Sequence, residues 1–220
     1  MTSQADGLFI VFEGGDAVGK STQMAWLAAA LEQAGRPHVE TFEPGATWVG
    51  ERIRDLVLNP ASGPICARAE ALLYLADKAQ HVAEVIKPNL ADGLVVVSDR
   101  YTDSAIAYQG AGRQLTGDGV EMVELATWAT GGLRPDLTIL LDADPTEAVE
   151  AIEAKDRLEG AGLDLHLRVR QEYLDLAASD PDHYLILSAD LPRHEIAAAI
   201  RDRLNNFGLE LSAPPGMMDE

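Results

Sequence analysis

The chain has 220 residues, a formal net charge of −19 and one cysteine, Cys66. The acidic excess disfavours binding to nucleic acid polymers and anionic membranes, and no apolar run approaches the length of a membrane span. A lone cysteine excludes an internal disulfide framework, and residues 1–6 lack the basic and apolar regions of a signal peptide. We therefore expect a cytoplasmic protein with one domain over residues 1–208, no membrane or nucleic acid partner, and room for small anionic substrates.

A glycine-rich segment near the N-terminus carries the strongest signal. The apolar run 8–12 predicts a buried strand and residues 21–34 predict a helix. Between them, Gly14-x-x-x-x-Gly19-Lys20-Ser21 is a P-loop, whose backbone N–H groups and helix N-terminus cradle phosphates. Lys20 would contact the terminal phosphates and Ser21 would offer a hydroxyl to Mg²⁺. The predicted nucleotide-binding residues are Gly14, Gly15, Asp16, Ala17, Val18, Gly19, Lys20, Ser21 and Thr22.

Strand and helix patterns alternate along the rest of the chain, which favours an α/β fold with a mainly parallel sheet. The further strands are expected at 38–42, 94–97, 137–141 and 184–187. The further helices are expected at 47–58, 66–87, 119–130, 145–154, 165–178 and 192–206, with Pro88 ending the second of them. We expect a loop at 109–114, a lid at about 153–163 and a disordered tail at 209–220. Trp26, Trp48 and Trp128 fall within helical patterns and are expected to pack.

Asp99 and Arg100 follow the apolar strand 94–97, at the carboxyl end where open α/β sheets bind ligands. A carboxylate near a P-loop is the usual partner of a phosphate-bound Mg²⁺, so Ser21 and Asp99 are the candidate metal ligands. The alternative for Asp99 is a helix cap or a structural pair with Arg100. Arg100 itself is placed to bind a second phosphate through both of its terminal nitrogens.

Several segments, in order along residues 8–178, resemble thymidylate kinases, which are P-loop nucleoside-monophosphate kinases. They are Phe12-Glu13-Gly14-x-Asp16-x-x-Gly19-Lys20-Ser21-Thr22, Glu43-Pro44-Gly45, Ala76-Asp77-Lys78-Ala79-Gln80-His81, Asp99-Arg100-Tyr101-x-x-Ser104-x-x-Ala107-Tyr108-Gln109-Gly110, and Asp156-Arg157-x-Glu159 with Arg168-Val169-Arg170-x-x-Tyr173. The resemblance implies a three-layer P-loop kinase fold, with a five-stranded sheet flanked by helices and a short lid. It also implies a homodimer that phosphorylates dTMP to dTDP with ATP and Mg²⁺.

The same resemblance implies roles for single residues. Asp16 would accept a hydrogen bond from the deoxyribose 3′-hydroxyl or touch the metal shell. Tyr74 would stack on thymine, although ordinary helix packing is the alternative, and Lys78 would contact a base carbonyl. Arg100 would hold the acceptor monophosphate. The complete implied substrate-binding set is Asp16, Glu43, Pro44, Tyr74, Lys78, Arg100, Ser104, Tyr108 and Gln109.

Four departures from the family pattern affect these roles. Ala17 replaces the common glycine and is not the arginine that some members carry, so the lid must supply the catalytic arginine. We predict that this residue is Arg157, and the alternatives are Lys155 and Arg168. The other predicted catalytic residues are Lys20, Asp99 and Arg100. Phe42 stands where an arginine often precedes Glu-Pro-Gly. Lys78 replaces an arginine, so it offers a point charge instead of a planar guanidinium. The lid is also short.

Three alternative functions follow from these features. A kinase for another deoxynucleoside monophosphate would explain Lys78 and Phe42. A GTPase-like switch is disfavoured because no Asn-Lys-x-Asp guanine signature occurs. A catalytically lapsed, nucleotide-binding relative would explain the short lid.

Overall fold

The computed structural model describes residues 7–115, 121–146 and 162–212. Its centre is a five-stranded sheet in the order β2-β3-β1-β4-β5. The strands are β1 (Leu8–Gly14), β2 (His38–Phe42), β3 (Val95–Asp99), β4 (Leu137–Asp142) and β5 (Tyr184–Ser188). Every neighbouring pair runs parallel, so the carboxyl ends of all strands meet at one edge. The predicted α/β fold with a mainly parallel sheet is confirmed.

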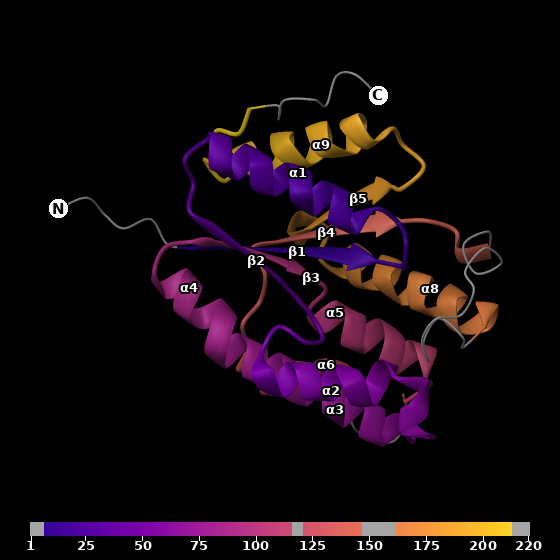
Figure 1. The fold of residues 1–220 in the computed structure, drawn as a ribbon. Coiled ribbons are helices and arrows are strands. Elements are labelled where there is room, and N and C mark those ends of the chain that lie inside the picture. Colours follow the sequence, from indigo (N-terminus) through magenta and orange to yellow (C-terminus); the bar gives the residue numbers. More distant parts are fainter. Residues whose placement is uncertain (1–6, 116–120, 147–161, 213–220) are drawn as a thin grey trace.

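Helices cover both faces of the sheet, which gives three layers (Figure 1). One face carries α1 (Lys20–Gln33) and α9 (Arg193–Asn205). The helices on the other face are α2 (Trp48–Leu58), α3 (Ala67–His81), α4 (Lys87–Ala91), α5 (Thr102–Ser104), α6 (Met122–Thr130) and α8 (Leu163–Ser179). The described ranges also contain two π-helical segments, η2 (Val82–Ile86) and η3 (Ala105–Gly112), and two short 3₁₀ turns, η1 (Pro60–Ser62) and η5 (Pro181–His183).

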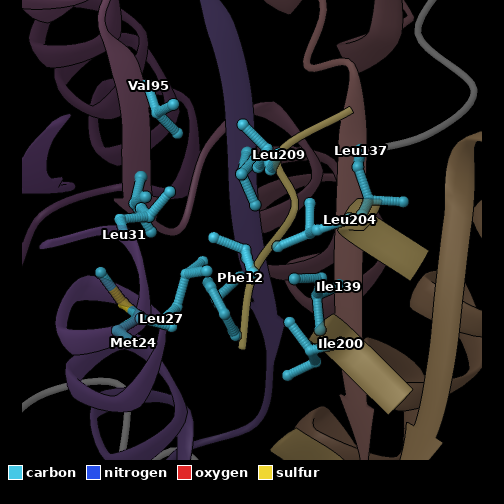
Figure 2. Close-up of a cluster of buried hydrophobic side chains, with 14 of the residues drawn as sticks. Phe12, Met24, Leu27, Leu31, Val95, Leu137, Ile139, Ile200, Leu204 and Leu209 are labelled. Carbon is cyan, nitrogen blue, oxygen red and sulfur yellow. The ribbon is translucent and has the colours of Figure 1, made fainter. Parts of the chain in front are cut away.

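The central strand β1 is buried on both faces, as its unbroken apolar run predicts. Ile10 and Phe12 point into the core beneath α1 and α9, whereas Phe9 and Val11 pack against the opposite layer with Tyr101. Figure 2 shows the first of these clusters, where Phe12 lies among Leu27 and Met24 of α1 and Ile200 of α9. This packing holds β1 rigidly, so the loop at its carboxyl end starts from a well-defined position.

Two breaks predicted from glycine and proline are wrong. The helical path continues through Pro88 to Ala91, because the wide π turns of η2 precede the ring that would otherwise meet a carbonyl one turn back. Residues 109–112 are helical and part of η3, not a loop. A Cβ at Gly110 would lie 3.2 Å from Met122 Cγ, so the glycine allows α6 to pack closely.

The C-terminal boundary and two tryptophans also differ from expectation. Leu209 and Leu211 are buried in the cluster beneath α1 and α9, so a tail beginning at residue 209 is wrong for residues 209–212, and residues 213–220 lie outside the described part. Trp48 and Trp128 are 70% and 82% exposed, because they sit on the outward sides of α2 and α6. That the chain forms a single domain stays a prediction. Within the described ranges, no helix is both long enough and apolar enough to cross a bilayer.

Candidate active site

The P-loop connects β1 to α1 at the carboxyl edge of the sheet. Gly14 ends β1 with φ +132°, and a Cβ there would lie 2.3 Å from the carbonyl oxygen of Leu141 on β4. Ala17 adopts φ +60°, a left-handed conformation that costs an L-residue about 1 kcal/mol. The departure from glycine at position 17 therefore leaves the loop conformation in place with some backbone strain.

Lys20 is the first residue of α1 and is buried. Its Nζ donates to the carbonyl oxygens of Gly15 at 2.6 Å and Gly14 at 3.4 Å. Burial and the neighbouring Arg100 charge lower the pKa of Lys20 to about 8, against the opposing effect of Asp99. The ammonium group is thus held inside the loop, beside the N-terminus of a helix that favours anions.

The P-loop opens onto a cleft of about 720 Å³. Its near wall is formed by Asp16, Ala17, Val18, Gly19, Lys20, Ser21 and Thr22. Its far wall includes Phe42, Glu43, Arg54, Asp99 and Arg100. The remaining two predicted nucleotide-binding residues, Gly14 and Gly15, lie beside the start of α8 in a smaller cavity with Asp142 and Arg170.

The side chains expected to hold Mg²⁺ face the same cleft. Asp99 Oδ1 is buried and lies 4.0 Å from Lys20 Nζ, with no hydrogen-bond partner within the described ranges. Ser21 is exposed to the cleft. The described residues contain no group of three or more His, Cys, Asp or Glu side chains that could hold a metal by themselves. One hydroxyl and one carboxylate fit Mg²⁺, which keeps most of its coordination for phosphate oxygens and water.

Arg100 turns back from the end of β3 towards the P-loop. Its backbone has φ +72°, a strained conformation that is fixed by a hydrogen bond from Arg100 N to Phe12 O of 2.9 Å. The guanidinium donates to Asp16 Oδ1 at 2.6 Å and to Gly14 O at 3.0 Å. Arg100 therefore pairs with Asp16 and not with Asp99, which leaves Asp99 available to a metal.

The charge of Asp16 is set by this pairing. Burial opposes its ionisation, but the Arg100 and Lys20 charges outweigh burial and hold the pKa of Asp16 below its usual value. Tyr108 lies next to both groups, because the Arg100 Cζ is 5.3 Å from its ring centroid and its hydroxyl donates to Asp16 Oδ2 at 3.4 Å. Asp16 is thus ionised at neutral pH, and an ionised carboxylate is a good acceptor for a hydrogen bond from a sugar hydroxyl.

A second, smaller pocket of about 110 Å³ adjoins the cleft. Its lining contains the whole implied substrate-binding set, namely Asp16, Glu43, Pro44, Tyr74, Lys78, Arg100, Ser104, Tyr108 and Gln109. Three further residues, Arg54, Leu58 and Ala105, line it as well. Nothing in the sequence separates Arg54 from the neighbouring Arg52, so this basic residue was missed. Arg54 donates to Pro44 O at 2.7 Å and stacks on Phe42, the residue that replaces the common arginine.

The floor of the small pocket contains a buried ion pair between Lys78 and Glu43. Glu43 also accepts from His81 Nδ1 at 2.7 Å, and burial is outweighed by Lys78 and His81, which hold the pKa of Glu43 below its usual value. Next to it, Asp77 accepts from Gly45 N at 3.0 Å, and burial and Glu43 raise the pKa of Asp77 to about 6. Lys78 is therefore engaged within the protein, and its contact with a base carbonyl stays a prediction.

The position of Tyr74 is compatible with both roles considered for it. Its ring packs against Ile53 and Val57 of α2, and it also lines the small pocket. Packing on one side leaves the opposite side to a flat ligand, so the two interpretations do not exclude each other.

The candidates for the lid arginine are only partly testable. Arg157 and Lys155 lie outside the described residues. Arg168, the second reserve, donates to Gly112 O at 2.9 Å and lines neither the cleft nor the small pocket. Its neighbour Arg170 is bound to Asp142 and Asp144. Of these candidates, Arg157 stays the prediction.

A P-loop cleft and an adjoining pocket that share Arg100 have the arrangement that transfer of a phosphoryl group between two nucleotides requires. The fold and the site together define the class of P-loop nucleotide kinases.

Comparison with known proteins narrows the class. The family model for thymidylate kinase matches residues 12–200. The thymidylate kinase of Cutibacterium acnes is 61% identical over 91% of this chain and 98% of its own length. The thymidylate kinase of Clavibacter michiganensis subsp. michiganensis is 52% identical over 90% and 94%. The crystal structure of thymidylate kinase from Ehrlichia chaffeensis superimposes with a TM-score of 0.71 at 27% identity, covering 91% and 99%. The chain belongs to the thymidylate kinase family.

Proposed function

We propose that this protein transfers the γ-phosphoryl group of ATP to dTMP, giving ADP and dTDP for dTTP biosynthesis. The observation that carries the proposal is the position of Arg100, which lines both the cleft at the P-loop and the small pocket beside it. From that wall, a guanidinium can hold the acceptor phosphate in line with a triphosphate bound by residues 14–22. Family membership supports the same reaction.

Catalysis in this site consists of positioning and charge neutralisation. The nucleophile is an anionic phosphate oxygen, so no strong general base is needed. Lys20 and Arg100 offset charge on the transferring group, and Arg157 does so from the lid. Closure of the lid excludes water and prevents hydrolysis of ATP.

We infer that Mg²⁺ is held by Ser21 and Asp99, because a hydroxyl and a buried carboxylate oxygen that accepts no hydrogen bond from the described residues face the cleft together. When bound, this ion neutralises charge on the β- and γ-phosphates. Asp99→Asn should raise the Mg²⁺ concentration needed for half-maximal rate, whereas the exposed Asp202→Asn should leave it unchanged. An identical Mg²⁺ requirement in both variants would reject Asp99 as a ligand.

The acceptor is recognised by the small pocket. Tyr74 stacks on the base, Asp16 accepts from the 3′-hydroxyl, and Ser104, Tyr108 and Gln109 line the nucleoside. Gln109 is fully buried, and its amide nitrogen lies 3.5 Å from Glu70 Oε1, which orients the amide. Arg113 binds the same carboxylate at 2.9 and 3.1 Å and so holds it in place.

ADP release should be measured with dTMP, dUMP, dCMP and dGMP as acceptors, with Lys20→Ala as the inactive control. We expect the highest kcat/KM with dTMP and loss of most of the kcat in Lys20→Ala. The second candidate function is a kinase for another deoxynucleoside monophosphate. It is favoured by Lys78 and Phe42, which depart from the family pattern. A preference for dUMP, dCMP or dGMP would establish that candidate. Turnover that is negligible in both proteins would indicate a lapsed enzyme.

We further propose that the protein is a cytoplasmic homodimer. The adjacent helices α2, α3 and α6 carry the exposed apolar side chains Trp48, Leu72 and Trp128, which suit burial against a second copy. Sedimentation analysis should give twice the chain mass, and Leu72→Glu should halve it. Leu191→Glu, a matched change next to α9, should leave the dimer intact. A monomer in the unsubstituted protein would reject the homodimer.

A further inference from the structure

Glu13 is a charged residue of β1 to which the proposed reaction assigns no role. Its side chain is completely buried, next to the first glycine of the P-loop. A buried carboxylate is costly unless it is hydrogen-bonded, so its partners show what it does.

Those partners come from three elements that surround the acceptor site. Glu13 Oε1 accepts from Tyr101 N at 2.8 Å and from Ser104 N at 3.2 Å. Glu13 Oε2 accepts from Ser104 Oγ at 2.7 Å and from Tyr173 OH at 2.9 Å. The carboxylate thereby joins the turn after β3, the last residue of α5 and the middle of α8. It fixes the backbone that follows Arg100, because Tyr101 is the next residue and Ser104 lies about one helical turn further along the chain.

Two of these partners are shared with Arg100. The Arg100 guanidinium donates to Ser104 Oγ at 3.2 Å and to Tyr173 OH at 3.3 Å. Each hydroxyl has a single proton, so a hydroxyl that donates to Glu13 turns its lone pairs towards Arg100. Glu13 therefore acts on the guanidinium through two oriented hydroxyl groups as well as through the backbone.

We propose that Glu13 is the positioning residue for the acceptor phosphate, because its carboxylate orients the Ser104 and Tyr173 hydroxyls that aim Arg100 into the space between the cleft and the small pocket. The inference rests on the proposed transfer to a nucleoside monophosphate and adds a residue that does not itself touch substrate. Tyr173 is the second member of this arrangement and connects it to α8.

The charge state of Glu13 provides a readout that a purely structural role would not. Burial raises the pKa of Glu13 to about 7, Asp103 acts in the same direction and Arg100 opposes both. The charged or titratable groups that act on Glu13 or respond to it are Asp103 and Tyr184, Arg100, Lys20, Tyr108 and Tyr173. Only the ionised carboxylate accepts from both hydroxyls at once, so use of the acceptor should fall as pH drops through this range.

Glu13→Gln is the direct test, because glutamine keeps the shape and the acceptor for the two backbone N–H groups but reverses the bonds to the hydroxyls. We expect kcat/KM for dTMP at pH 8 to fall by about 10- to 100-fold, as misplacement of a binding group predicts, with KM for ATP within about threefold of the unsubstituted enzyme. The part of the acidic limb of the kcat/KM profile that lies above the titration of the dTMP phosphate itself, whose second pKa is about 6, should disappear. The exposed Glu32→Gln removes the same charge from α1 and should change neither.

A second variant covers the case in which Glu13→Gln does not fold. Asp103→Asn leaves all bonds of Glu13 in place and removes the neighbouring carboxylate, so the acidic limb should move to lower pH. A profile and a kcat/KM for dTMP that match the unsubstituted enzyme in Glu13→Gln would overturn the role of Glu13, as would an unmoved limb in Asp103→Asn. Failure of the unsubstituted protein to phosphorylate dTMP would instead reject the proposed function.

Discussion

Lys78→Met should expose how much the buried pair beneath the acceptor pocket contributes to stability. The Lys78 and Glu43 side chains are 2% and 1% exposed, so solvent cannot replace the lost ammonium group. Removing one partner of such a pair costs about 3 to 5 kcal/mol, because the other charge is left uncompensated. His81 still donates to Glu43 in the variant, which places the expected loss near the lower end, at about 3 kcal/mol.

The assay is urea unfolding at pH 8 and pH 5, followed by circular dichroism. A loss of about 3 kcal/mol corresponds to a melting temperature lowered by about 6 to 12 °C for a domain of this size. In the unsubstituted protein, Lys78 holds the pKa of Glu43 below its usual 4.5, so the pair contributes above that range and is lost as pH falls through the lowered pKa. In the variant the buried carboxyl takes up a proton more readily, so the difference between the two proteins should narrow at pH 5.

Lys78→Arg is the matched control, because it keeps the charge and the residue type of the family pattern. Its unfolding free energy should stay much closer to that of the unsubstituted protein. A loss below about 1 kcal/mol in Lys78→Met, or a difference that grows towards pH 5, would refute the assignment of a buried, charged pair.

Three further predictions address other parts of the chain. Arg100→Lys replaces the planar fork by a point charge and should lower kcat/KM for dTMP by about 10- to 100-fold in the ADP-release assay; an unchanged value would remove Arg100 from the acceptor site. Asp77→Asn should become more stable relative to the unsubstituted protein by about 3 kcal/mol as pH rises from about 4 to about 7. In the native protein the pKa of Asp77 is raised from 3.8 to about 6, so the native carboxyl holds a proton that the unfolded chain has already lost, and the unsubstituted protein loses stability across this window. Urea unfolding at both pH values tests the sign. Leu209→Ala should cost about 2 kcal/mol in the same assay, because Leu209 is only 6% exposed, and a neutral effect would restore the tail to residue 209.

The elements of the fold were accessible from local pattern. The apolar run before Gly14 and the β-branched run before Asp99 each predicted a strand, and both are central and buried on two faces. The two wrong breaks, at Pro88 and within 109–114, share one cause. Proline and glycine signal a turn only where the backbone has no other constraint, and here π-helical geometry and the close approach of α6 override the local preference.

The composition of the acceptor pocket was accessible through the resemblance to thymidylate kinases, because the motifs that carry the resemblance are short and local in the sequence. Arg54 was not predicted, because the sequence does not show which of the two arginines on this helix, Arg52 or Arg54, faces the pocket before the helix packs in the fold. Pairing partners were out of reach for a similar reason. The sequence suggested Asp99 as a possible partner of Arg100, whereas the turn of the chain after β3 brings the guanidinium to Asp16.

The linear order of residues thus determined that a phosphate-binding loop, a carboxylate and an arginine would meet at the ends of neighbouring strands, because strand and helix periodicity and short motifs are properties of a few adjacent residues. Three-dimensional packing alone decided which charged and polar side chains would be buried together. Glu13 with Tyr173 and Glu43 with Lys78 are separated by 160 and 35 positions, and only the closed fold removes the water that would otherwise keep each of them independent.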